Sequence, residues 1–216
     1  MVITYYGLSC FKVESGKLTL AFDPPSRESD VKPPRFSADV VTSSHNHERH
    51  NGLKELSGDP FLISGPGEYE TKNLLITGSP SFHDKSNGAK KGLNTIYTVE
   101  MEDIRLCHLG DLGTTELSPE TLEAIGEIDI LFIPTGGGDV LDPEEAVKVI
   151  NVLEPKIVIP MHYTLPKTSI KGAKVEEFLE ELGEKGVKSE DKFTIKRKEL
   201  VQDGTKAVVL NPVISL

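Results

Sequence analysis

Histidines are the residues of this 216-residue chain whose type and spacing are best suited to chemistry. Three of the six, His45, His47 and His50, lie within six positions, directly after the apolar segment 39–43. If that segment is a strand, the first two imidazoles can enter one space at its end, and the third can come from the first turn of a helix. Neutral imidazole nitrogens are ligands that Zn²⁺ prefers. The cluster therefore predicts a metal site, although a lone histidine is more often an ordinary core or surface residue.

Three further candidate ligands follow other apolar segments of strand length. They are His83, Asp111 and His162. Gly110 and Gly113 flank the aspartate and permit a tight turn that directs its carboxylate toward a buried site, although a Gly-Asp pair alone is more often an ordinary turn. Loops at one edge of a sheet converge, so ligands from four separate strand ends are expected to form a single metal site.

Short strands must position these residues. Runs rich in β-branched and aromatic residues, separated by Gly, Pro and Asn, predict a β-rich first half. The strand candidates are residues 2–6, 10–13, 18–22, 39–43, 61–64, 74–77, 95–100, 104–108, 128–134 and 156–160. The segment 14–17 has turn chemistry and predicts a hairpin between the second and third of these strands.

Helical signals begin after residue 117. Segments that start at Ser118 and Asp142 each place a capping side chain before a proline, and the second helix should end near Leu153. The remaining expected elements are a helix over 174–182 and a closing pair of strands over 193–196 and 207–210. Strands first and helices interleaved later predict an α/β fold, with two mixed β-sheets packed together, helices outside, and one domain over residues 1–216.

Composition limits the class of protein. The chain has 24 Lys and Arg against 34 Asp and Glu, a net charge of −10 that disfavours binding to nucleic acid. Two cysteines, Cys10 and Cys107, provide neither a disulfide framework nor a cysteine-based zinc site. No apolar run reaches the length of a membrane span, and the first residues lack the pattern of a signal peptide. We therefore expect a cytoplasmic protein with a small-molecule substrate; formation of a homo-oligomer stays open.

The sequence resembles the metallo-β-lactamase superfamily. Residues 45–50 are similar to its motif His-x-His-x-Asp-His, and later His, Asp and His residues follow in the same order. Segments 6–11, 22–24, 108–111 and 160–163 resemble the branch related to ascorbate-6-phosphate lactonase. The likeness extends from residue 2 to about residue 165. It implies an αββα sandwich and a Zn²⁺-dependent hydrolase, but it does not identify the substrate, because this fold supports many reactions.

The resemblance implies two metal positions. It assigns His45, His47 and His83 to the first metal, His50 and His162 to the second, and Asp111 as a bridge between them. Asp111 and His108 are the candidate catalytic residues; His108 lies beside the ligand set and could orient a ligand or contact the substrate. Asp23 is expected to support the histidine loop. One or two Zn²⁺ ions are expected, with Mn²⁺ or Fe²⁺ as alternatives.

Arg49 departs from the motif, which has aspartate at this position. A guanidinium cannot ligate a metal, and its charge is repelled by Zn²⁺. Either Arg49 turns outward and the site remains dinuclear with altered affinity, or one metal is bound and Arg49 contributes to substrate binding by holding an anionic group. Glu48 is a minor candidate for a substitute ligand.

A bound Zn²⁺ lowers the pKa of its water to about 7, so metal-bound hydroxide can attack an ester, lactone, amide or phosphodiester centre. The sequence has no competing serine nucleophile motif, and 63–67 is typical of a turn. The loop 136–139 is expected to form a wall of the site rather than a nucleotide loop, and the lysines of 85–91 to be solvated rather than to steer an anionic substrate. Alternative functions are a non-catalytic metal- or ligand-binding protein, an RNA nuclease and, less favoured, a di-iron oxidoreductase.

Overall fold

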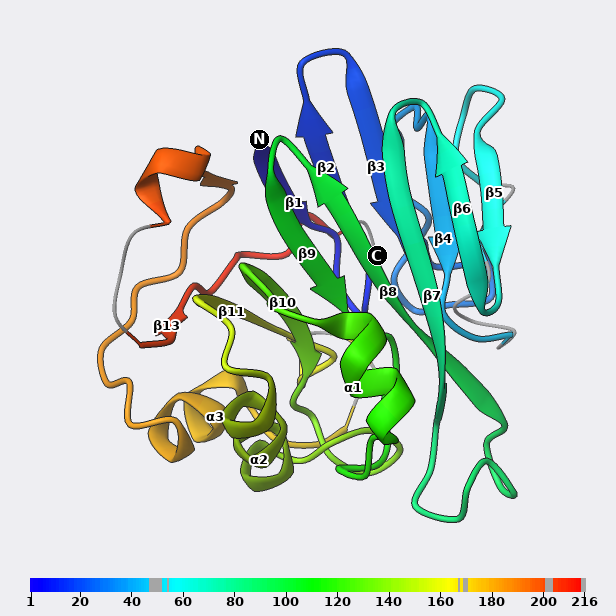
Figure 1. Cartoon of the computed structure of the whole chain (residues 1–216). Helices are drawn as coiled ribbons and strands as arrows, with labels where there is room; N and C mark the ends of the chain where they lie inside the picture. The colour runs from blue at the N-terminus through cyan, green and yellow to red at the C-terminus, as the bar shows by residue number, and fades with distance from the viewer. Residues whose placement is uncertain (47–51, 54, 167, 169–170, 201–203, 215–216) are drawn as a thin grey trace.

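Two mixed β-sheets pack against each other in the structure, a computed structural model that describes residues 1–46, 52–53, 55–166, 168, 171–200 and 204–214 (Figure 1). The first sheet has the strand order β12-β1-β2-β3-β4-β5 and the second the order β13-β11-β10-β9-β8-β7-β6. The strands of the first sheet are β1 (Val2–Tyr5), β2 (Phe11–Ser15), β3 (Leu18–Phe22), β4 (Val40–Ser43), β5 (Phe61–Ser64) and β12 (Phe193–Thr194).

The second sheet contains antiparallel and parallel strands. Its strands are β6 (Gly67–Thr71), β7 (Leu74–Phe82), β8 (Leu93–Met101), β9 (Ile104–His108), β10 (Ile130–Pro134), β11 (Ile157–Met161) and β13 (Lys206–Ala207). Strands β6 to β9 are antiparallel, whereas β9, β10, β11 and β13 run parallel. The fully buried run of β10 is typical of a parallel strand that is covered on both faces.

The main core lies between the two sheets. Strand β1 alternates half-buried and buried residues, which shows that one face of this strand is directed inward. Aromatic rings fill the centre, and Phe11 lies against Phe132 of the opposite sheet with ring centroids 4.5 Å apart. The hairpin predicted over 14–17 is present, with Ser15 paired to Leu18. The contact between Phe11 and Phe132 thus joins the two sheets across this core.

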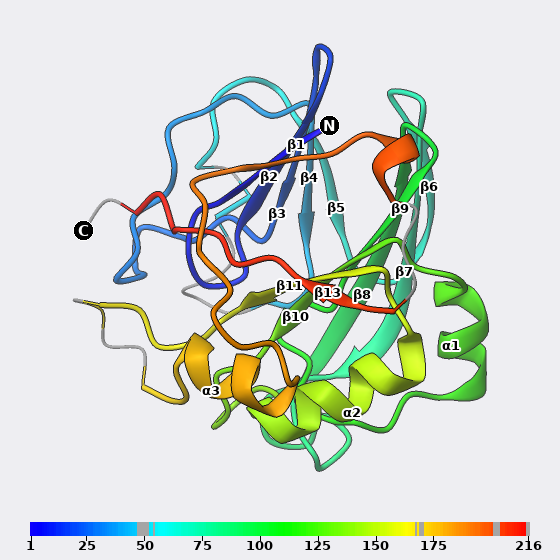
Figure 2. The ribbon, with the colours of Figure 1, turned by 90° about the vertical axis from the view of Figure 1, so that its left-hand side faces the viewer.

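Three helices lie on the outer face of the second sheet (Figure 2). They are α1 (Pro119–Ile125), α2 (Pro143–Leu153) and α3 (Val175–Glu181), and a short 3-10 helix, η1, covers Arg197–Glu199. Ser118 and Asp142 cap α1 and α2 as the sequence predicts, each accepting a backbone hydrogen bond. Among the described residues, no helix has the length and apolar character needed to cross a membrane.

The outer face of the first sheet is covered differently. There Ala21 and Val41 pack against Ala38 and Leu56 from the loops beside β4. The predicted sandwich of two mixed sheets is therefore confirmed, but within the described part of the chain its helices lie on one side only. Among the described residues, loop segments that contain Ala38 and Leu56 cover the other side.

Two expectations about strands are corrected by the structure. The segments 193–196 and 207–210 do not pair with each other: β12 pairs with β1 in the first sheet, and β13 pairs with β11 in the second. Strand β6 was not expected, because its polar sequence, Gly67–Thr71, lacks the alternation that marks a strand. It is an exposed edge strand, and such a strand has no face that must be apolar.

Candidate metal centre

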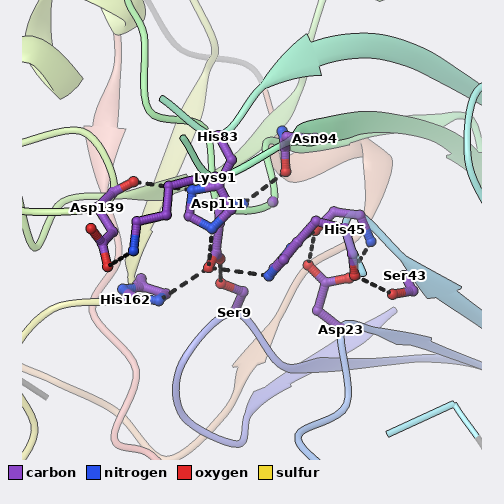
Figure 3. Close-up of polar contacts among 12 residues, drawn as sticks. Ser9, Asp23, Ser43, His45, His83, Lys91, Asn94, Asp111, Asp139 and His162 are labelled. Atoms are coloured by element: carbon purple, nitrogen blue, oxygen red, sulfur yellow. Dashed lines mark hydrogen bonds and ion pairs between the residues drawn. The ribbon is translucent and has the colours of Figure 1, made fainter. Parts of the chain in front are cut away.

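Four side chains from separate strand ends meet at one edge of the sandwich (Figure 3). His45 follows β4, His83 follows β7, Asp111 follows β9 and His162 follows β11. The Nε2 atoms of His45 and His83 each lie 3.5 Å from Oδ2 of Asp111, and Nε2 of His162 lies 3.3 Å from the same oxygen. The sequence therefore predicted correctly that these four distant residues come together.

The donor atoms of this cluster suit a divalent metal ion. Ligand atoms of His45, His83 and Asp111 all lie within 4.8 Å of one another, and all three residues are buried. The rings of His45 and His83 are nearly perpendicular, with centroids 4.9 Å apart, so their edges can approach a shared point. Three imidazoles and one carboxylate make up a donor set typical of zinc and of other transition-metal ions.

Outer hydrogen bonds orient two of the imidazoles. Nδ1 of His83 donates to the backbone oxygen of Asp139 at 3.1 Å. Nδ1 of His45 lies 2.9 Å from Oγ of Ser44, and this hydroxyl donates to the carboxylate of Asp23. Because Nδ1 is engaged in both rings, Nε2 is the nitrogen directed to the centre. Asp23 thus binds Ser44, the residue before His45, and its support of the rest of the histidine loop stays a prediction.

Asp111 is held at its backbone and at its carboxylate. The backbone N–H of Asp111 donates to Oδ1 of Asn94 at 3.0 Å, and Nδ2 of Asn94 donates to the backbone oxygen of Leu109 at 2.8 Å. At the carboxylate, Oγ of Ser9 donates to Oδ1 at 2.6 Å. Oδ1 is therefore engaged by the protein, and Oδ2 faces the three imidazoles.

The electrostatics of the cluster favour positive charge at its centre. Burial lowers the pKa of His83 and of His162, but the neighbouring carboxylate of Asp111 outweighs burial and raises both values. Burial raises the pKa of Asp23 to about 7, although hydrogen bonds from Ser44 oppose that shift. A buried carboxylate that stabilises protonated imidazoles provides the same attraction to a metal cation.

Glycines allow the ligand loops to approach each other closely. A Cβ atom at Gly113 would lie 2.5 Å from the backbone oxygen of His83, and one at Gly136 would lie 2.0 Å from the backbone oxygen of His162. A Cβ atom at Gly110 would lie 2.4 Å from the side chain of Ser44. No side chain fits at these positions without displacing a loop that carries a ligand. The loop 136–139 lies against His162 at Gly136 and contacts His83 through the backbone of Asp139; its role as a wall of the site stays a prediction.

His108 lies beside this cluster in a different environment. It is fully buried, and its ring stacks on Phe22 at an interplanar angle of 2°. Nε2 donates to the backbone oxygen of Ser9 at 2.8 Å, and Nδ1 accepts from the backbone N–H of Gly110 at 3.2 Å. Burial lowers the pKa of His108 to about 4, so the ring is neutral. These surroundings favour a positioning role over direct contact with substrate.

Lysines of the predicted basic loop lie at the rim of the site. Lys91 forms an ion pair with Asp139, with Nζ and Oδ2 3.0 Å apart, and Lys85 pairs with Glu145. Both lysine side chains are exposed. They are solvated and paired with acidic side chains, which agrees with the more favoured of the two sequence interpretations.

Three predicted site residues, His47, Arg49 and His50, lie outside the described residues, as does Glu48. Sequence reasoning gave no role to Ser9, Ser44 or Asn94, although Ser9 lies within the quoted segment 6–11. Single serines and asparagines in strands and turns have no distinctive spacing. Their role depends on which distant residue they contact, so no local signal could have identified them.

Comparisons with known proteins agree with this geometry. The Beta-lactamase superfamily domain matches residues 2–162. A UPF0173 metal-dependent hydrolase from Thermococcus onnurineus is 26% identical over 211 residues, which cover 85% of this chain and 92% of that protein. One from Carboxydothermus hydrogenoformans is 28% identical over 194 residues, covering 76% and 84%.

Solved structures show the same fold. A protein from Thermotoga maritima that is assigned to the Zn-dependent hydrolases of the metallo-beta-lactamase superfamily has a TM-score of 0.79 and 33% identity, with 97% of each chain covered. Igni18, a metallo hydrolase from Ignicoccus hospitalis, has a TM-score of 0.66 and 23% identity, with 90% of this chain and 99% of that chain covered. The expected superfamily, fold and class of activity, a metal-dependent hydrolase, are confirmed, and the lactonase-related branch stays a prediction. With a family match that covers most of its length, the chain belongs to the metallo-β-lactamase superfamily.

Proposed function

We propose that this protein hydrolyses a small molecule with a metal ion, Zn²⁺ in the first instance, held by His45, His83, His162 and Asp111. The observation that carries this proposal is the convergence of three Nε2 atoms on one carboxylate oxygen, at 3.3–3.5 Å. A divalent cation bound there would polarise the scissile bond and make hydroxide available at neutral pH. The residues of the chain then have distinct tasks.

Asp111 has the central task among them. Its Oδ2 faces the imidazoles and would be the carboxylate ligand of the cation, and its negative charge would offset part of the charge of that cation. His45 and His83 hold their Nε2 atoms toward the same point because their Nδ1 atoms are engaged by Ser44 and by the backbone of Asp139. The buried walls of the site exclude bulk water and strengthen these electrostatic interactions.

The number of metal ions depends on residues 47–50, which lie outside the described residues. We propose that His47 contributes to the first metal position and His50 to the second, and that Arg49 weakens the second position by its charge. Arg49→Asp should then raise the molar ratio of bound metal to protein. Elemental analysis after dialysis, for the wild type and this variant, measures that ratio; an unchanged ratio would mean that Arg49 does not oppose a second ion.

The substrate proposed is a small molecule with an ester, lactone, amide or phosphodiester group, and an anionic one if Arg49 faces the site. The cytoplasm is the proposed compartment, because both cysteines are buried and unpaired with each other. Metal-depleted protein should hydrolyse none of these classes, and addition of Zn²⁺, Mn²⁺ or Fe²⁺ should restore turnover of at least one. The matched control is Asp111→Ala under the same conditions, which should stay inactive with every metal.

A non-catalytic metal-binding protein is the second candidate. The replacement of the motif aspartate by Arg49 favours it, because that aspartate would otherwise accept a hydrogen bond from the attacking water. Stoichiometric metal binding without turnover in all four substrate classes would support this candidate over the hydrolase. Failure of the wild type to bind any of the three metals would exclude both.

A further inference from the structure

Ser9 occupies an unusual place for a residue of the first sheet. It belongs to the turn 6–10, which joins β1 to β2, yet its hydroxyl reaches Asp111 of the second sheet, 102 positions away in sequence. Ser9 is fully buried, and its Oγ lies 2.6 Å from Oδ1 of Asp111. In Figure 3 its side chain approaches the carboxylate from the opposite side to His83. This contact links the two sheets at the metal centre.

The contact determines which carboxylate oxygen is available to the centre. A carboxylate can rotate about its Cβ–Cγ bond, and either oxygen can act as a ligand. A hydroxyl fixed at Oδ1 restricts this rotation and leaves Oδ2 facing the three imidazoles. Hydrogen bonds to an ionised acceptor are short and about twice as strong as neutral ones, so the restriction is energetically significant.

The turn that carries Ser9 is itself anchored to the second sheet at several points. The backbone oxygen of Ser9 accepts from Nε2 of His108 at 2.8 Å, and the backbone oxygen of Leu8 accepts from the N–H of His162 at 2.9 Å. Tyr5 donates its hydroxyl to the same Leu8 oxygen at 2.9 Å. The turn is thus bonded to the loops that carry Asp111 and His162.

The turn 6–10 and the segment at His162 both contain residues in the left-handed backbone region, which surrounding contacts must hold. Gly7 and Leu8 have φ values of +88° and +53°, and His162 has a φ of +54°. Non-glycine residues in the left-handed region are strained, and they persist where surrounding contacts determine their conformation. Leu8 and His162 are joined by a hydrogen bond, so two strained residues hold each other at the edge of the site.

We propose that Ser9 is a positioning residue of the metal centre: its hydroxyl fixes the carboxylate of Asp111 with Oδ2 toward the metal, and the anchored turn 6–10 sets the distance between Asp111 and His162. His108 acts in the same unit, because it holds the backbone of Ser9. The inference rests on the proposed function, since it presupposes a metal held by Asp111. It assigns the first sheet a direct part in a centre whose described ligands, apart from His45, come from the second sheet.

Ser9→Ala tests the proposal through metal affinity. Loss of an outer hydrogen-bond partner of a ligand weakens metal binding by about 10- to 100-fold, and this range is expected here. The affinity of metal-depleted full-length protein for Zn²⁺ is measured by competition with a chelating indicator. The absorption spectrum of the Co²⁺-substituted protein should also change, because an unrestrained carboxylate alters the coordination geometry.

Ser79→Ala is the matched control. Ser79 is a similarly buried serine within β7, away from the ligand loops, and its loss removes the same single oxygen. This variant should keep the Zn²⁺ affinity and the Co²⁺ spectrum of the wild type, whatever its effect on unfolding. Equal affinities for wild type, Ser9→Ala and Ser79→Ala would overturn the inference and leave the proposed function intact, whereas absence of metal binding in the wild type would overturn both.

A second pair of variants separates the hydroxyl from the shape of the side chain. Ser9→Thr keeps a hydroxyl and Ser9→Val has the same shape without one, so both disturb packing alike. Ser9→Thr should bind Zn²⁺ at least about tenfold more tightly than Ser9→Val. Equal affinities would contradict the role of the hydroxyl. This pair also provides the test if Ser9→Ala fails to fold.

Discussion

Two buried aspartates lie at opposite ends of the second sheet, and their surroundings differ in the source of positive charge. Asp129 precedes β10 and accepts hydrogen bonds from Nζ of Lys156 at 2.6 Å, from Nη1 of Arg197 at 2.7 Å and from the backbone N–H of Arg105 at 2.9 Å. Burial opposes ionisation of Asp129, but these donors outweigh it and lower the pKa. Permanent cations of the chain therefore neutralise this carboxylate.

Asp111 follows β9 at the other end and faces three imidazoles instead. Imidazoles near neutral pH carry no fixed charge, so protons or a bound cation must supply it. A buried carboxylate alone therefore does not mark a functional site. A carboxylate with lysine and arginine partners is complete as a structural element, whereas one with imidazole partners is arranged to receive a cation from outside.

Replacement of each aspartate by asparagine should give the largest difference between the two ends of the sheet, and this difference should appear in Zn²⁺ affinity. Asp111→Asn removes the negative charge that attracts the metal, and we expect Zn²⁺ affinity to fall by more than about 100-fold, beyond the cost of losing an outer partner. Asp129→Asn should leave the affinity unchanged. Competition with a chelating indicator measures the Zn²⁺ affinity of both variants. A comparable loss of affinity in the two would contradict the assignment of the metal centre to the Asp111 end alone.

The free energy of unfolding should show the reverse order, with a larger loss for Asp129→Asn than for Asp111→Asn. Asp129→Asn is expected to lower the free energy of unfolding by about 1.5–3 kcal/mol, because hydrogen bonds to a charged group are lost. The lowered pKa of Asp129 means that its contribution is present above the unfolded value of 3.8 and lost as pH falls through the folded value. Urea unfolding at pH 7 and at low pH measures this, and a deficit that persists at low pH would contradict the assignment.

Gly136→Ala probes how closely the loops at the Asp111 end must approach. The added Cβ would meet the backbone oxygen of His162, so we expect a loss of about 1–3 kcal/mol in stability and weaker Zn²⁺ binding. Gly183→Ala is the control, because no atom lies within 4 Å of its Cβ position and only its φ of +80° is unfavourable. If both variants kept wild-type metal affinity, close approach would not matter to the centre.

The pH dependence of stability tests two buried groups near Asp111, His108 and Asp23. Burial lowers the pKa of His108 from 6.5 to about 4 and raises that of Asp23 from 3.8 to about 7. Between these limits the folded chain holds one proton on Asp23, and the unfolded chain holds one on His108. The two proton counts are equal, so this pair adds no slope to stability between about pH 4 and 6.5.

Asp23→Asn removes the proton from the folded state only. Stability of the metal-free variant should then rise with pH by about 1.4 kcal/mol per unit more than that of the wild type between pH 4.5 and 6. Urea unfolding with EDTA present measures the two profiles. Parallel profiles would show that the folded chain holds no proton on Asp23 in this pH range, so that burial does not raise the pKa of Asp23 as stated.

The sequence predicted the strand ends that carry His45, Asp111 and His162 to within one residue, because apolar runs followed by His or Asp are local patterns. The strand before His83 was expected to end at residue 77, but β7 continues to Phe82. Strands β3, β5 and β9 match the expected bounds, and helix α2 runs to Leu153 as expected. The partners of β12 and β13 could not be predicted, because pairing of two-residue strands depends on which sheet edge lies nearby. The contacts of Ser9 and Asn94 with Asp111 could not be predicted either, because these partners are distant in sequence and only the assembled fold brings them together.

Anomalous scattering at the zinc edge, from crystals of the full chain grown with Zn²⁺, tests the central claim most directly. The account predicts a peak within about 2.0–2.2 Å of Nε2 of His45, His83 and His162 and of Oδ2 of Asp111. A zinc-loaded protein with its peak elsewhere, or with these four side chains turned away from it, would contradict the account.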